Sequence, residues 1–110
     1  MPYGLPNEAL DRLISLLRQD RYIHKIWLFG SRALGREKPG SDIDICLEAP
    51  TLGTRELSAL EAQIDDLLLP WKVDLTILHH IADPDVLAHI RRVGIELSGH
   101  SDSFHEKQRI

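Results

Sequence analysis

Residues 27–45 read WLFGSRALGREKPGSDIDI, and they contain the clearest structural signals in the chain. The run over residues 23–29 is rich in β-branched and aromatic residues and predicts a strand. Residues 30–40 hold three glycines and one proline among charged residues, which predicts a loop with a helical turn over residues 31–34. Residues 42–48 alternate in polarity and predict a second strand. The segment is therefore typical of a strand–loop–strand unit.

Two predicted helices flank this unit. Asn7 is placed to cap the first helix, whose apolar residues recur at helical spacing. These residues are Leu10, Leu13, Ile14 and Leu17. Thr54 can cap the second helix, which Pro70 ends because proline cannot continue the hydrogen-bonded ladder.

The remaining chain predicts one more strand and one more helix. Residues 71–78 alternate as a third strand, and Asp83 with Pro84 can open a third helix. The order α-β-loop-β-α-β-α predicts a single α/β (α+β) domain over residues 1–98. Residues 99–110 are polar and aperiodic, and we expect them to form a flexible tail.

Three aspartates lie on these otherwise apolar strands. Asp42 and Asp44 are two apart, so their side chains share one face, about 7 Å apart along the backbone. Asp74 on the third strand would join them if the strands are neighbours. Aspartate is disfavoured in strands, and a divalent cation offsets the repulsion between clustered carboxylates. We predict that these residues are catalytic and bind Mg²⁺, with two ions as in nucleotidyl transfer. The alternative is that they are solvated residues on half-exposed strands.

The glycine-rich loop is a candidate phosphate-binding site. Gly30 allows the backbone to approach a ligand closely, and Ser31 can donate its hydroxyl to a phosphate oxygen. Arg32 or Arg36 can pair with phosphates. Ser41 completes the set of predicted nucleotide contacts. Two familiar phosphate loops are excluded, because Lys and Ser/Thr do not follow the second glycine and no G-x-G-x-x-G run exists.

Gly30-Ser31, ten intervening residues and Asp42-x-Asp44 together resemble the signature of the DNA polymerase beta superfamily of nucleotidyltransferases. The segment 30–45 looks like its small prokaryotic branch, the minimal nucleotidyltransferases (MNT). Asp74 falls where that family places its third carboxylate. The resemblance covers about residues 5–97 and implies a palm-like fold. In that fold a small mixed β-sheet packs its helices on one face, and the metal site lies on the other.

The resemblance also implies a reaction. The Gly30-Ser31 turn would hold the triphosphate of ATP, and Asp42 and Asp44 would bind Mg²⁺. Asp74 would complete a second metal site or act as base on the acceptor hydroxyl, so that AMP is transferred and pyrophosphate leaves.

Minimal family members are commonly encoded beside a HEPN-domain protein. The resemblance therefore implies a hetero-oligomer in which this chain is the antitoxin and neutralises a HEPN ribonuclease toxin by AMPylating a tyrosine. Two alternatives stay open: transfer to a small acceptor such as an aminoglycoside, and neutralisation by contact alone. A chain of 110 residues has no visible acceptor domain, so we expect the acceptor to be another protein.

Composition limits which partners and which cellular compartment are expected. The chain has 13 Lys and Arg against 17 Asp and Glu, and this net charge of −4 argues against electrostatic binding of long nucleic acid. Its single cysteine, Cys46, cannot form an internal disulfide, and we expect it to be a small buried side chain. With no signal peptide and no apolar run of about 20 residues, the chain is expected to be cytoplasmic and not to enter a membrane.

Overall fold

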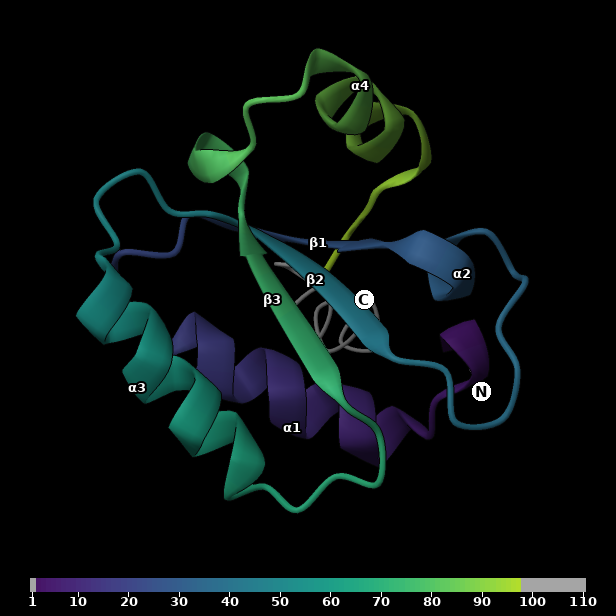
Figure 1. Cartoon of the computed structure of the whole chain (residues 1–110). Coiled ribbons are helices and arrows are strands. Elements are labelled where there is room, and N and C mark those ends of the chain that lie inside the picture. The colour runs from purple at the N-terminus through teal and green to yellow at the C-terminus, as the bar shows by residue number, and fades with distance from the viewer. Residues whose placement is uncertain (1, 98–110) are drawn as a thin grey trace, which may run out of the picture.

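The structure is a computed structural model that describes residues 2–97. The tail predicted over residues 99–110 therefore lies outside the described residues. Within the described range, no helix is long and apolar enough to cross a membrane. The chain runs in order through η1 (Pro2–Gly4), α1 (Asn7–Arg18), β1 (Lys25–Phe29), α2 (Gly30–Ala33), β2 (Ile43–Glu48), α3 (Thr54–Asp65), β3 (Val73–Ile77), η2 (Leu78–His80), α4 (Pro84–Val93) and β4 (Ile95–Glu96) (Figure 1).

The strands form one mixed sheet in the order β3-β2-β1-β4. β1 pairs antiparallel with β2, and this places Phe29 opposite Asp44. β2 pairs parallel with β3, and this places Asp74 opposite Asp44. Parallel neighbours need a long crossover connection, and α3 provides it. The predicted mixed sheet is confirmed, and the third strand is the neighbour of the second.

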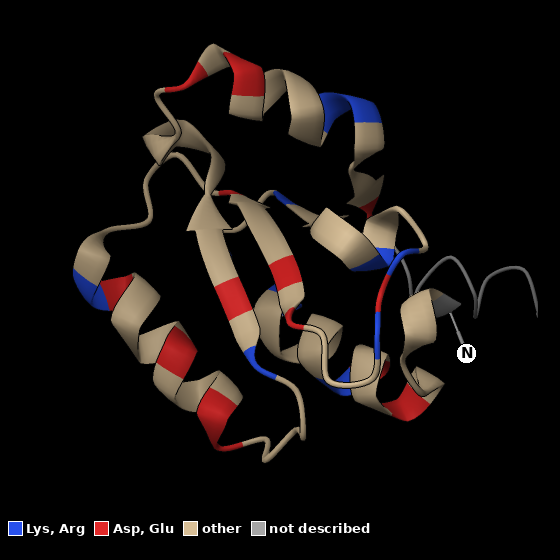
Figure 2. Cartoon of the chain, turned by 45° about the vertical axis from the view of Figure 1, so that its right-hand side comes forward, with Lys and Arg blue, Asp and Glu red and all other residues tan. Residues whose placement is uncertain are grey.

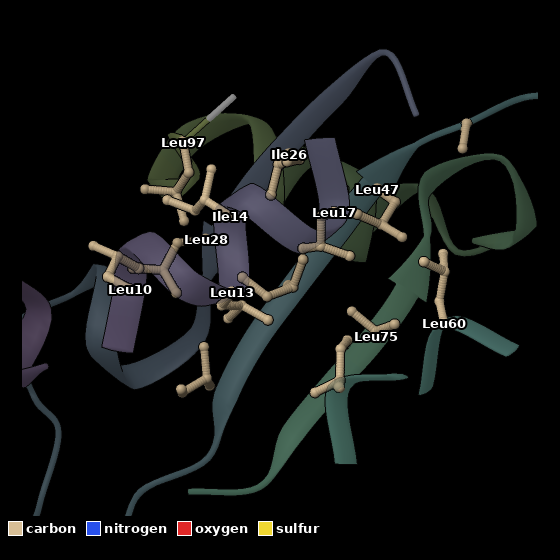
Figure 3. Close-up of a cluster of buried hydrophobic side chains, with 14 of the residues drawn as sticks. Leu10, Leu13, Ile14, Leu17, Ile26, Leu28, Leu47, Leu60, Leu75 and Leu97 are labelled. Atoms are coloured by element: carbon tan, nitrogen blue, oxygen red, sulfur yellow. The ribbon is translucent and has the colours of Figure 1, made fainter. Parts of the chain in front are cut away.

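The main core lies between the sheet and the helices α1 and α3. Figure 3 shows the aliphatic side chains of these elements meeting in one cluster. The four residues predicted from helical spacing in α1 are all at most 1% exposed. Complete burial of one such side chain stabilises the fold by about 1.5–3 kcal/mol, so this cluster is the main source of stability.

A smaller contact lies on the opposite side of the sheet, where α4 packs (Figure 1). Ile90 of α4 and Cys46 of β2 are buried there, outside the main cluster. A Cβ added to Gly94, after α4, would lie 3.5 Å from the Trp27 ring, and the Trp27 indole N–H donates to Glu48 at 3.0 Å. The predicted packing of helices on one face therefore describes α1 and α3, whereas α4 covers part of the other face.

Helix starts differ by one residue from two of the predictions. Asn7 and Thr54 are the first residues of their helices and not their caps. The backbone N–H of Gly53, before Thr54, instead donates to the Glu56 carboxylate at 3.0 Å. Asp83 caps α4 as predicted, accepting from the backbone N–H of Asp85 at 2.9 Å. The strand β4 was not predicted, because two residues carry no readable alternation.

Candidate functional site

The site begins where β1 ends. Gly30 follows Phe29 with a φ of +74°, a conformation that side-chain-bearing residues rarely adopt. It starts the short helix α2, in which the backbone N–H of Leu34 donates to the Gly30 carbonyl at 3.2 Å. A Cβ on Gly30 would overlap the Asp44 carboxylate oxygen Oδ2. The turn therefore lies directly against Asp44, and this contact requires glycine.

The three aspartates lie on the sheet face away from α1 and α3. Asp44 is half-buried, whereas Asp42 and Asp74 are exposed. Figure 2 shows the acidic segments of β2 and β3 side by side, as the pairing of Asp44 with Asp74 requires. Directly opposed residues on neighbouring strands are close enough for their side chains to interact. The structure thus brings together the residues that the sequence had placed on separate strands.

The electrostatics of this cluster centre on Asp44. Burial raises the pKa of the Asp44 carboxyl above its ordinary value, and the charges of Asp74 and Asp42 raise that pKa further. Arg32 is the positive group that opposes these effects. The folded chain therefore holds Asp44 where its negative charge is disfavoured, which is typical of a position that a bound cation would stabilise.

The donor set fits Mg²⁺ only in part. Among residues 2–97, no three His, Cys, Asp or Glu side chains are grouped so that they could hold a metal ion by themselves. Mg²⁺ in nucleotide sites is held by one or two carboxylates together with substrate phosphates and water, so a complete protein cage is not required. Asp42 and Asp44 could provide the carboxylates of such a site. The metal role of Asp42, Asp44 and Asp74 stays a prediction.

Arg32 lies in a different environment from the one its predicted phosphate contact assumed. It is 2% exposed. Its two terminal nitrogens donate to backbone carbonyls, Nη1 to Tyr3 at 2.9 Å and Nη2 to Ser41 at 2.7 Å. Its guanidinium carbon also lies 5.9 Å from the centroid of the Trp71 ring. In this arrangement Arg32 contacts protein groups, and its contact with a phosphate stays untested.

Ser41 helps to close the loop that leads into β2. Its hydroxyl accepts from the backbone N–H of Lys38 at 2.8 Å, and the Ser41 N–H donates to the Lys38 carbonyl at 2.9 Å. At the start of the loop, the Arg36 N–H donates to the Ser31 carbonyl at 2.8 Å. Both predicted serines thus lie at the ends of one hydrogen-bonded loop. Their contact with a nucleotide stays a prediction.

Sequence reasoning missed the residues that surround Arg32. Tyr3 and Trp71 contact it from segments far away in the chain. Glu37 has a buried carboxylate oxygen, Oε1, without a hydrogen-bond partner. No local sequence pattern signals the contact of Tyr3 with Arg32. A charged loop residue such as Glu37 is usually solvated, so its burial was not expected either.

The comparisons with known proteins concern the family and the fold. The sequence matches the family described as polymerase beta, nucleotidyltransferase over residues 11–103. None of the curated proteins is detectably similar in sequence.

Three solved structures illustrate the shared fold. A chain from a toxin–antitoxin crystal structure with AMP-PNP has a TM-score of 0.67 and 25% identity, covering 91% of this chain and 89% of that chain. A mutant of the MntA–HepT toxin–antitoxin gives 0.66 and 26%, over 96% of this chain and 90% of that chain. A chain from the tri-AMPylated Shewanella oneidensis HEPN toxin in complex with MNT antitoxin gives 0.61 and 23%, over 93% and 87%.

The last of these likenesses concerns the fold alone, whereas the family match covers most of the sequence, including the Gly30 turn and the three aspartates. The chain belongs to the polymerase beta nucleotidyltransferase family.

Proposed function

We propose that this chain is a Mg²⁺-dependent nucleotidyltransferase that moves AMP from ATP to a hydroxyl of a HEPN-domain partner, and that it serves as the antitoxin of that pair. The observation that carries the proposal is the contact between the Gly30 turn and Asp44, with Asp74 opposite Asp44 in the sheet. Family membership supports nucleotidyl transfer in general. Two structural neighbours support the donor and the partner: a chain from a toxin–antitoxin structure with AMP-PNP, and a chain from a mutant of the MntA–HepT toxin–antitoxin.

The Gly30 turn would bind the donor triphosphate. The absence of a side chain at Gly30 leaves its backbone accessible beside Asp44, and the Ser31 hydroxyl can donate to a phosphate oxygen. Asp42 and Asp44 would hold Mg²⁺ with the phosphate oxygens, where the ion would supply charge neutralisation. Asp44 is suited to this role, because its pKa is raised by burial and by the charges of Asp74 and Asp42, and a nearby cation would oppose these effects.

Asp74 would act on the acceptor. It is exposed on the edge strand β3 and directly opposite Asp44. Its carboxylate can accept the proton of an acceptor hydroxyl as the hydroxyl oxygen bonds to the α-phosphorus. The bond from that phosphorus to the bridging oxygen breaks, and pyrophosphate leaves with the electron pair. The exposure of Asp74 leaves room for an acceptor that belongs to another protein.

A second function, neutralisation of the partner by contact alone, is favoured by one observation. The described residues contain no group of three possible metal ligands that could hold an ion unaided. A chain with this function would bind its partner without transferring AMP, so the two functions are separated by a transfer assay.

The test is incubation of the chain and its co-expressed HEPN partner with Mg²⁺ and ATP labelled at the α-phosphate. Transfer predicts label on the partner, and Asp44→Asn abolishes that label. Asp65→Asn, an exposed acid at the end of α3, is the matched control and should transfer normally. Label on neither protein, with the complex still formed, would favour contact alone, and undiminished transfer by Asp44→Asn would refute the assignment of Asp44.

A further inference from the structure

We propose that Arg32 is a positioning residue through which the N-terminal segment, residues 3–5, holds the Gly30 turn and the start of β2 in their active arrangement. This inference rests on the proposed function, because it concerns the geometry of the same site. It differs from a role in phosphate binding, because Arg32 would act through backbone groups and not through contact with the nucleotide.

The first step is the way Arg32 joins three parts of the chain. The residue itself belongs to α2, so its backbone moves with the Gly30 turn. Its side chain donates to the carbonyl of Tyr3 at 2.9 Å and to that of Ser41 at 2.7 Å. Ser41 directly precedes Asp42. One guanidinium therefore fixes the distance between the candidate phosphate turn and the residue that leads into the paired aspartates.

The second step is the contact with Trp71. The guanidinium carbon lies 5.9 Å from the centre of the Trp71 ring, within the range of a cation–π interaction. Trp71 lies just before β3, which carries Asp74. Arg32 thus contacts the segments that lead into both strands bearing carboxylates, and a planar guanidinium can make all of these contacts at once.

The third step is the fit of the N-terminal segment around Arg32. Leu5 is completely buried, and Tyr3 has a φ of +59°. Gly4 has a φ of +73°, and a Cβ there would lie 3.0 Å from Arg32 Nη1 and 3.0 Å from Glu37 Oε2. The segment is therefore packed tightly against both a buried cation and a carboxylate.

The fourth step is charge. A buried guanidinium is costly unless its charge is compensated and its donors are used. The Glu37 carboxylate and the Arg32 guanidinium both lie close to Gly4, so Glu37 brings an opposite charge near Arg32. Arg32 Nε and Glu37 Oε1 nevertheless lack hydrogen-bond partners. Such an arrangement is expensive for stability alone, and a role in positioning the site would account for its presence.

The test uses full-length chain with Arg32→Lys, which keeps the charge but lacks the planar fork that donates to both carbonyls. Arg55→Lys, an exposed arginine of α3 outside the site, is the matched control. In Arg32→Lys we expect amide hydrogen exchange over residues 3–5 and 34–42 to be at least about tenfold faster, with β1 and the rest of β2 unchanged. The transfer rate should fall at least about tenfold, while the dissociation constant for AMP-PNP with Mg²⁺ changes less than about fivefold.

Gly4→Ala is a milder variant that disturbs the N-terminal segment and keeps the Arg32 side chain. It should lower the transfer rate, and the double variant with Arg32→Lys should lose little more than the worse single variant. Gly40→Ala is its control, because Gly40 has a φ of +86° but no atom within 4 Å of an added Cβ.

Either of two results would overturn the proposal. Unchanged exchange over residues 3–5 and 34–42 in Arg32→Lys would show that Arg32 does not hold these segments. A rise of the AMP-PNP dissociation constant above about fivefold would indicate direct phosphate binding instead. If the wild-type complex transfers no AMP, the proposed function fails, and the exchange measurement still decides the role of Arg32.

Discussion

Replacing Gly30 with alanine is the sharpest test of the site, because two separate costs are expected and each can be measured. The first is conformational: alanine at a φ of +74° costs about 1–2 kcal/mol relative to glycine. The second is steric, because the new Cβ would overlap Asp44 Oδ2. Moving that carboxylate away from its preferred rotamer costs about another 0.5–1.5 kcal/mol.

Gly35→Ala separates these two costs. Gly35 has a φ of +70°, and a Cβ there would have no neighbour within 4 Å. This control should therefore show the conformational cost alone. For a domain of this size, 1 kcal/mol corresponds to about 4–8 °C in the melting temperature. We expect Gly30→Ala to melt several degrees below Gly35→Ala, as measured by thermal unfolding under identical conditions.

The functional difference should exceed the difference in stability. A displacement of a reacting group by about 1 Å can reduce a rate by about a hundredfold. Gly30→Ala should therefore lose AMP transfer at temperatures where it is still folded, and Gly35→Ala should retain it. In an Asp44→Ala background, Gly30→Ala should cost only the conformational part. Equal melting temperatures for Gly30→Ala and Gly35→Ala, with transfer retained in both, would refute the contact between the turn and Asp44.

Three further predictions concern stability. Asp44→Asn should raise stability at pH 7, because burial and the charges of Asp74 and Asp42 raise the pKa of Asp44, which means that the folded state disfavours the carboxylate. That advantage should shrink as the pH falls through the folded pKa toward 3.8, which thermal melts at several pH values would measure. Burial raises the pKa of Cys46 to about 11 from 9.0, so the wild type should lose up to about 2–3 kcal/mol between pH 9 and 11 relative to Cys46→Ala; parallel denaturant titrations that fail to diverge over this range would contradict it. Gly94→Ala should destabilise the fold by about 1–3 kcal/mol, since the added Cβ would overlap the Ile90 carbonyl oxygen, and a melting temperature equal to wild type would refute that contact.

The strands and the acidic positions could be predicted from the sequence because they depend on local alternation. Asp42 and Asp44 share a face in any strand, and Asp74 lies opposite its apolar neighbours in any strand. What alternation cannot give is which strands are neighbours and in what register. The parallel pairing of β2 with β3 brings Asp74 opposite Asp44, and it depends on the packing of the α3 crossover against the sheet.

The role of Arg32 shows where local reasoning stops. An arginine in a glycine-rich loop after a strand predicts a phosphate contact, and the sequence contains no sign of its burial. That burial is produced by Tyr3, which is 29 residues earlier, and by Trp71 from the segment before β3. The helix starts at Asn7 and Thr54 illustrate a smaller limit, since either neighbouring residue can begin the helix with nearly the same local energy.

The negative charge of the aspartates is only partly compensated by Arg32. Three aspartates lie on the exposed side of the sheet, where the described residues provide no assembled set of three metal ligands, and burial of Asp44 makes its charge costly. Arg32 is the cation that partly offsets this cost, but its terminal nitrogens are bound to the carbonyls of Tyr3 and Ser41. A guanidinium held in this way cannot approach a ligand without releasing both segments. A bound cation would instead add positive charge beside Asp44, and under that condition a nucleotide with its cation binds more tightly to the folded site than either does alone.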